Sequence, residues 1–214
     1  MATPNRAALI AKVLKVVRKH YKPVAPPKER TVLEHLLFAC LVEDSPNESA
    51  EQVFNALKHD YFGWNEVRVS TIRELTDALK PLVNPAESAA RLKQTLHSVF
   101  ESVYEFDIES LKKQNIGQAA KLLQKYNGTT PFAVAYVTQN ALGGHAIALN
   151  RGTLIALHAV RQTEPRLGDR VLVMGQGLVG LLITNLLQAS GARVMAVDLL
   201  PSRRAFCQAM GAEK

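Results

Sequence analysis

The chain has 214 residues, 47% of them hydrophobic and 21% charged, a balance that is ordinary for one or two soluble globular domains. It contains no run of 18 apolar residues, so no membrane span is expected. The two cysteines, Cys40 and Cys207, lie far apart without a CxxC partner. This spacing argues against a disulfide framework, a zinc site and an iron–sulfur cluster held by four thiolates, and it favours a reducing, cytoplasmic environment.

The first 30 residues account for the whole net charge of +7, because they contain eight basic residues and a single acid. Apolar residues at helical spacing predict a helix over residues 7–20, and prolines at 23, 26 and 27 predict an extended linker after it. The lysines opposite the apolar stripe, Lys12, Lys15 and Lys19, are candidate contacts for DNA phosphates. The alternative interpretation is a solvated tail with no partner.

The next region, residues 31–160, is predicted to be a helical domain. Its expected helices cover residues 32–41, 49–57, 71–79, 86–104, 117–126, 131–142 and 152–160, with a short turn or helix at 108–111. Thr31 and Glu34 form the pattern of a capping box before the first of these helices. Residues 61–64 are expected to form a turn whose aromatic residues, Phe62 and Trp64, fill the core; the alternative is that they wedge into DNA.

Four segments of this region, at 32–41, 90–96, 126–137 and 141–150, carry a resemblance to a known family. They resemble the helix-hairpin-helix DNA glycosylase superfamily, which includes endonuclease III, and the resemblance extends over residues 31 to about 159. It implies a hairpin that binds a phosphate of duplex DNA through backbone N–H groups, next to a cleft that receives a flipped base. By this match the hairpin contacts are Gly128, Thr129 and Thr130.

The sequence departs from the family pattern at three positions. The second hairpin glycine is replaced by Thr130. The position of the family's catalytic lysine is occupied by Phe132, which cannot form a Schiff base, and that of its aspartate by Asn150, which cannot ionise. The resemblance therefore implies a DNA-binding, base-excision-repair-related module without lyase chemistry. In the alternative interpretation, Gly128 and Asn150 only cap helices.

After residue 161 the pattern changes to a strand at 171–174, a glycine-rich turn, a helix, and a second strand at 193–198. This order predicts a parallel α/β unit. Gly175, Gly177 and Gly180 have the spacing of a turn that brings a pyrophosphate to a helix N-terminus, and Asp198 ends the second strand. The candidate cofactor-binding residues are Gly175, Gln176, Gly177, Leu178, Val179, Gly180, Asp198 and Arg203.

Residues from about 157 to 214 resemble the beginning of the coenzyme domain of the medium-chain, zinc-type alcohol dehydrogenases. The resemblance implies NAD as the cofactor, with Asp198 accepting hydrogen bonds from the ribose hydroxyls. Arg203 either reaches an adenine or a 2′-phosphate or belongs to a solvated helix face. The family's zinc ligands and its later strands have no counterpart here, so neither zinc binding nor hydride transfer by this chain is expected.

The sequence as a whole thus predicts a mainly α fold, a helix-hairpin-helix glycosylase-like bundle followed by a truncated Rossmann-like β-α-β-α unit. The expected domains are residues 1–30, 31–160 and 161–214. The expected function is DNA binding related to base-excision repair, fused to an incomplete NAD-binding unit. Two alternatives stay open: a fragment of an NAD-dependent alcohol dehydrogenase, and a gene fusion without a joint function. Residues 150–160 suit either family.

Overall fold

The computed structural model describes residues 30–213, together with Ala11 and Lys15. The chain divides into two units, residues 1–30 and 31–214. The predicted basic helix at 7–20 and the proline linker therefore lie outside the described residues, except that Ala11 and Lys15 are helical and exposed. Lys12 and Lys19 are not among the described residues.

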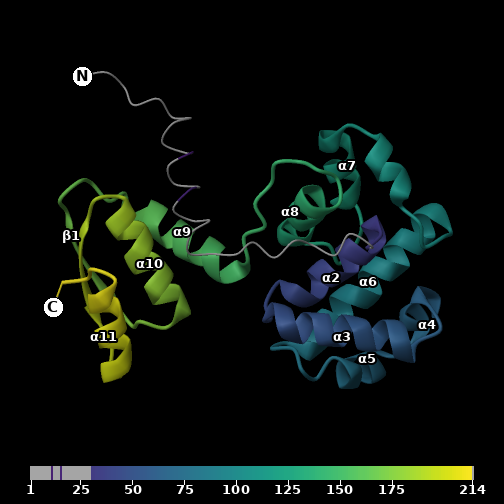
Figure 1. Ribbon diagram of the computed structural model, residues 1–214, viewed down its shortest axis with the longest axis horizontal. Coiled ribbons are helices and arrows are strands. Elements are labelled where there is room, and N and C mark those ends of the chain that lie inside the picture. The colour runs from purple at the N-terminus through teal and green to yellow at the C-terminus, as the bar shows by residue number, and fades with distance from the viewer. Residues whose placement is uncertain (1–10, 12–14, 16–29, 214) are drawn as a thin grey trace. The chain divides into compact units, whose positions relative to one another are not determined.

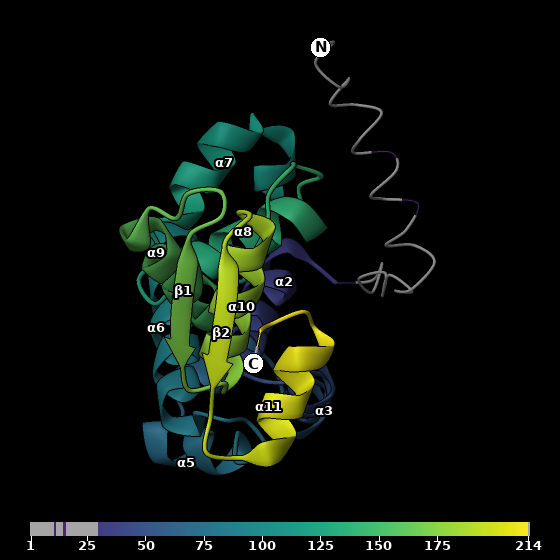
Figure 2. The ribbon, with the colours of Figure 1, turned by 90° about the vertical axis from the view of Figure 1, so that its left-hand side faces the viewer.

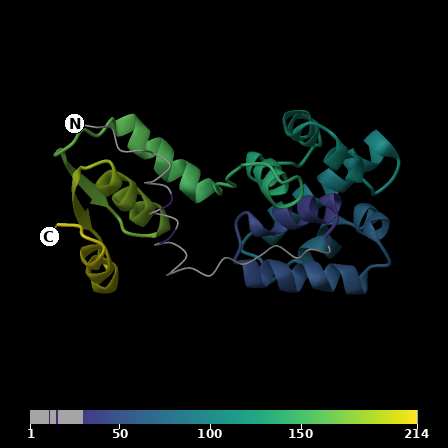
Figure 3. The same ribbon diagram turned by 45° about the horizontal axis from the view of Figure 1, so that its top comes forward.

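The first part of the larger unit is helical (Figure 1). Its elements are α2 (Val32–Val42), α3 (Asn47–Asp60), α4 (Trp64–Val69), α5 (Ile72–Ala78), α6 (Pro85–Val103), the 3₁₀ helix η1 (Glu109–Lys113), α7 (Ile116–Leu123) and α8 (Pro131–Asn140). Helix α2 lies between α3 and α8 and also contacts α6, while α6 contacts α4 and α5 (Figures 1 and 3). All residues from 32 to 41 are buried, so α2 is the centre of the helical core.

Local sequence sets the beginnings of these helices. The Thr31 hydroxyl accepts the N–H of Glu34, and the Glu34 carboxylate accepts the N–H of Thr31, which confirms the predicted capping box. Pro85 and Pro131 occupy the first position of α6 and α8, where the missing N–H costs nothing because such a group would have no partner inside the helix.

The prediction for residues 61–64 is wrong in two respects. Trp64 does not lie in a turn but begins α4, and its ring packs 5.6 Å from that of Phe54. Phe62 does not fill the core: its side chain is fully exposed, at 106%. The reason is that α3 continues to Asp60, three residues beyond the predicted end, so that the following turn projects away from the core.

The second part contains α9 (Arg151–Thr163), β1 (Arg170–Met174), α10 (Leu178–Ala189), β2 (Arg193–Val197) and α11 (Pro201–Ala209). The strands form a two-stranded parallel sheet in which Arg170 lies opposite Arg193. Helix α10 packs on one face of this sheet, and α11 contacts β2 (Figure 2). The mainly helical fold and the predicted order of strand, helix, strand and helix are thus confirmed.

A small separate core stabilises this second part. It contains Val160 from α9, Val173, Leu187, Ala192 and Val194. Helix α9 contacts α10 and contributes to this core, so the predicted domain boundary between residues 160 and 161 falls inside a continuous helix. On its other face the sheet exposes apolar side chains, those of Leu172, Met174, Met195 and Val197.

Candidate functional site

The turn between α7 and α8 is held against α6 so closely that residue 128 must be glycine. Gly128 has φ +86°, in the left-handed region. A Cβ atom there would lie 2.7 Å from the backbone oxygen of Arg91 and 2.8 Å from Oγ1 of Thr95. The alternative that Gly128 only caps a helix is wrong, because α7 already ends at Leu123 with Gln124 as its C-cap. The glycine serves instead to bring the hairpin onto α6.

The two threonines after Gly128 fix the shape of the hairpin. The Thr129 hydroxyl lies within hydrogen-bond distance of the carbonyl oxygens of Leu123 (3.0 Å) and Tyr126 (2.6 Å), which ties the turn to the end of α7. The Thr130 hydroxyl caps α8 by accepting the N–H of Ala133 at 3.1 Å. The replacement of the second family glycine by threonine therefore adds a side-chain cap to the helix.

Two backbone donors remain at the N-terminus of α8. Within the described part of the chain, no hydrogen bond is recorded from the backbone N–H groups of Thr130 and Phe132. Such groups carry the positive end of the helix dipole and bind anions readily. The hairpin therefore has the chemistry to hold a phosphate.

The two positions that correspond to the family's catalytic residues have structural roles. The Phe132 ring is stacked on Tyr136, with centroids 6.0 Å apart, and packs against the helical core. Asn150 is the N-cap of α9, because its side-chain oxygen accepts the N–H and the hydroxyl of Thr153, both at 2.9 Å. The interpretation of Asn150 as a helix cap is thus confirmed.

An ion network that the sequence analysis missed lies behind the hairpin. Arg91 on α6 donates to Oε2 of Glu43 at 2.5 Å and to Oδ2 of Asp44 at 3.1 Å. Glu43 also accepts the Thr130 hydroxyl at 2.8 Å. Burial raises the pKa of Glu43 above its ordinary value, although the hydrogen bond from Thr130 and the charge of Arg91 each act to lower it. An acid pair directly after an apolar helix was the only sequence signal for this network.

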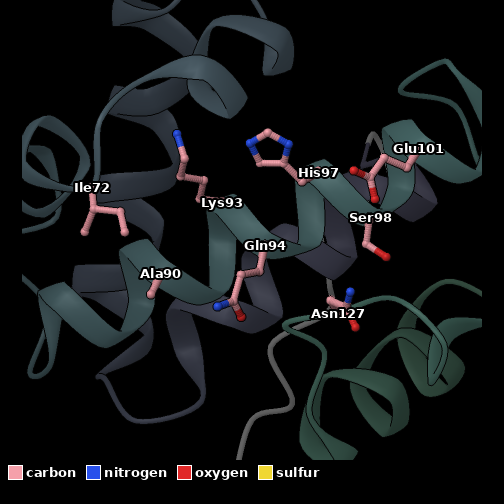
Figure 4. Close-up of a pocket in the computed structure, with 8 residues that line it drawn as sticks. All are labelled: Ile72, Ala90, Lys93, Gln94, His97, Ser98, Glu101 and Asn127. Carbon is pink, nitrogen blue, oxygen red and sulfur yellow. The ribbon is translucent and has the colours of Figure 1, made fainter.

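A cavity of about 350 Å³ opens beside the hairpin, between α6 and Asn127 (Figure 4). Lys93 and His97 project from one side of α6, and Gln94 projects from the side on which Asn127 lies (Figure 4). The Lys93 ammonium donates to the carbonyl oxygens of Arg68 (3.0 Å) and Ser70, at the end of α4. This cation therefore stabilises the end of a helix.

In the second part, the glycine turn has the geometry that its spacing predicts. Gly175 has φ +85°, and a Cβ on Gly180 would lie 1.9 Å from the oxygen of Gly175, so the turn and α10 touch at this point. A Cβ on Gly177 would meet nothing within 4 Å, and Gly177 is the N-cap of α10 without a side-chain cap. The backbone N–H groups of Leu178 and Val179 at the start of α10 are left with no recorded hydrogen bond in the described chain.

Gln176 occupies the turn with a fully buried side chain. Its amide nitrogen donates to Val173 O, and its amide oxygen accepts the hydroxyl of Thr184 and the thiol of Cys207, each at 3.1 Å. The buried side chain therefore links β1, α10 and α11. The sequence analysis predicted Gln176 as a cofactor contact and did not predict this internal role.

The Asp198 carboxylate is occupied by the protein itself. Its two oxygens accept the backbone N–H groups of Leu200 (2.8 Å) and Gln176 (2.6 Å), and Arg203 lies 3.5 Å away. These bonds, that from Leu200 most of all, lower the pKa of Asp198. Since a lowered pKa favours the ionised form, the contribution to stability is present above the ordinary pKa of an aspartate and is lost as the pH falls through the lowered value.

Arg203 is half-exposed and lines two neighbouring hollows, one with Gly177 and Leu178 and the other with Gly175 and Asp198. The structure thus brings most of the predicted cofactor residues together around the glycine turn.

Among the described residues, no group of histidine, cysteine or acidic side chains could hold a metal ion. Burial raises the pKa of the Cys40 thiol to about 11, which makes it a poor nucleophile.

No helix within the described ranges is long and apolar enough to cross a membrane.

No protein-family model matches the chain. Its fold is similar to that of endonuclease III in a structure of the enzyme trapped in a covalent intermediate with DNA, with a TM-score of 0.53 and 15% sequence identity. The similarity covers 78% of this chain and 70% of that one. The chain is therefore similar in fold to endonuclease III over most of its length, in line with the first resemblance.

Curated relatives are dehydrogenases and match over short stretches. (R,R)-butanediol dehydrogenase of Bacillus subtilis (strain 168) is 39% identical over 66 residues, which is 30% of this chain and 19% of the relative. L-galactonate-5-dehydrogenase of Escherichia coli (strain K12) is 41% identical over 59 residues, 28% of this chain and 17% of the relative. An uncharacterized zinc-type alcohol dehydrogenase-like protein of Haemophilus influenzae is 30% identical over 69 residues, 32% of this chain and 20% of the relative. The chain thus spans at most about a fifth of the length of these relatives, and the second resemblance is confirmed.

Proposed function

We propose that the helical part of this protein binds duplex DNA, with the hairpin at Gly128–Thr130 and the N-terminus of α8 holding a backbone phosphate. The proposal rests on two observations: the hairpin packs closely on α6 at Gly128, and the N–H groups of Thr130 and Phe132 at the start of α8 have no hydrogen-bond partner among the described residues. The fold similarity to endonuclease III supports a role in DNA repair. The lysines at 12, 15 and 19 would add phosphate contacts that carry no sequence information.

The structural roles of Phe132 and Asn150 support DNA binding without lyase cleavage of the strand. A lyase of this fold needs an amine that attacks the sugar and a carboxylate that assists it. Phe132 and Asn150 supply neither group, and both are committed to packing and capping. The function we propose is therefore recognition of DNA, in a repair context, without a covalent intermediate.

Borohydride trapping on a duplex with one abasic site tests this chemistry. We expect the protein to shift the duplex in a native gel and to form no covalent adduct after reduction, because no lysine replaces Phe132 at the α8 N-terminus. Endonuclease III serves as the positive control for trapping. A reduced adduct with the wild-type protein would contradict the proposal, and a matched intact duplex controls for non-specific crosslinking.

We also propose that the second part binds an adenine nucleotide, with NAD preferred. The specific observation is the open space at Gly177 next to the uncapped start of α10, where a pyrophosphate would meet the N–H groups of Leu178 and Val179. The identity to dehydrogenases supports this assignment.

A further inference from the structure

Arg91 contacts the hairpin from two directions. Its backbone oxygen is the nearest atom to the space beside Gly128, where a Cβ would lie 2.7 Å away. Its guanidinium holds Glu43, and Glu43 in turn accepts the hydroxyl proton of Thr130. The three residues are far apart in sequence, so this arrangement depends on the packing of α2, α6 and α8.

The bond to Glu43 fixes the direction of the Thr130 hydroxyl. A hydroxyl has one proton and two lone pairs. Because the proton is donated to Glu43, the lone pairs are left for the N–H of Ala133, which is the capping bond of α8. This arrangement keeps the Thr130 hydroxyl occupied inside the protein. The backbone N–H groups of Thr130 and Phe132, which have no partner within the described part of the chain, are the donors available to an anion.

The same carboxylates would oppose an anion if they were unpaired. Glu43 and Asp44 are 11% and 23% exposed, and both lie on Arg91, whose side chain is 11% exposed. Two negative charges beside a phosphate site, in a partly buried setting, repel a phosphate more strongly than they would in water. The guanidinium, which bridges the two carboxylates with one nitrogen on each, offsets one of these charges and orients both groups.

We propose that Arg91 is the positioning residue of the DNA-binding hairpin: through Glu43 it fixes Thr130, and its charge shields the phosphate site from the Glu43–Asp44 acid pair. This inference rests on the proposed function and adds a residue that acts on the hairpin through Glu43 and Thr130. It gives the acid pair a structural role, because Glu43 connects Arg91 to the hairpin residue Thr130. It also explains why a site for an anion tolerates two acids at its base.

The test is a rescue experiment in the full chain, read as the Kd for a fluorescein-labelled 20-base-pair duplex at low salt. Arg91→Gln is expected to weaken binding roughly tenfold, since it leaves both acids unpaired. Glu43→Gln in the Arg91→Gln background is expected to restore the Kd to within about threefold of wild type. The amide oxygen of Gln can still accept the Thr130 hydroxyl, while the negative charge of Glu43 is removed and only that of Asp44 remains. Arg91→Lys, which keeps the charge, should bind close to wild type.

Lys93→Gln is the matched control, because Lys93 is on the same helix but caps α4 and does not touch the acid pair. The change in Kd that Lys93→Gln causes should be the same with and without Glu43→Gln. Circular dichroism checks that each variant keeps its helical content. If Glu43→Gln fails to rescue Arg91→Gln while wild type binds, the inference is wrong and the proposed function stands. If wild type itself does not bind the duplex, both are wrong.

Discussion

Gly128→Ala is expected to destabilise the helical part by about 2–4 kcal/mol and to weaken duplex binding at least tenfold. The left-handed φ of +86° accounts for about 1 kcal/mol or more, because an L-residue is strained there. The rest comes from the new Cβ, which would meet the backbone oxygen of Arg91 at 2.7 Å. Backbone cannot move aside as a flexible side chain can, so the hairpin must lift from α6. Urea unfolding and the Kd for duplex DNA measure the two effects.

Gly143→Ala provides the control for this prediction. Gly143 also has a left-handed φ, +68°, but a Cβ there would meet nothing within 4 Å. We expect it to cost only about 1 kcal/mol, the strain alone, and to leave DNA binding nearly unchanged. Equal losses of stability and affinity in the two variants would show that the close approach of the hairpin to α6 does not matter.

Asp198→Ala is expected to abolish the stabilisation of the protein by NADH. Wild type at millimolar NADH should melt about a few degrees higher than without it, as any ligand that binds only the folded state raises the melting temperature. The substitution removes the acceptor for the N–H groups of Gln176 and Leu200, so the glycine turn and the loop after β2 lose their link. The protein should also melt at a lower temperature without nucleotide. Differential scanning fluorimetry measures both effects.

Asp169→Ala is a matched variant in the same part of the chain. The side-chain carboxylate of Asp169 accepts the N–H of Arg166 in an exposed turn before β1, whereas the glycine turn follows β1. It should leave the NADH-induced rise intact. A rise that survives in Asp198→Ala, or no rise in wild type, would contradict the assignment of this turn to a nucleotide.

The features that sequence predicts correctly here depend on neighbouring residues. The capping box at Thr31, the prolines that open α6 and α8, and the cap at Asn150 each involve residues within three positions of one another. The glycine turn of the second part is similar, because its strand, turn and helix follow one another directly. Residues so close in sequence are also close in space, so the pattern alone is enough to predict the local structure.

The features that sequence missed depend on distant residues. Arg91 and Glu43 are 48 positions apart, and Glu43 and Thr130 are 87 apart, so no local pattern shows that they meet. Phe62 was assigned to the core by its hydrophobicity, but the extra turn of α3 carries it into solvent. The sequence assigned Gly128 to a phosphate-binding hairpin or, alternatively, to a helix end, but it gave no sign that the backbone of α6 leaves no room for a side chain there.

The central claim is that the hairpin on α6 is a phosphate-binding element for DNA. Its most direct test is a titration of a labelled duplex with the full chain at salt concentrations from about 50 to 300 mM, because phosphate contacts release counterions. The account predicts that log Kd rises linearly with log salt, and that Gly128→Ala raises Kd at every salt concentration by the same factor. An absence of binding at the lowest salt, or a Gly128→Ala curve that coincides with wild type, would contradict it.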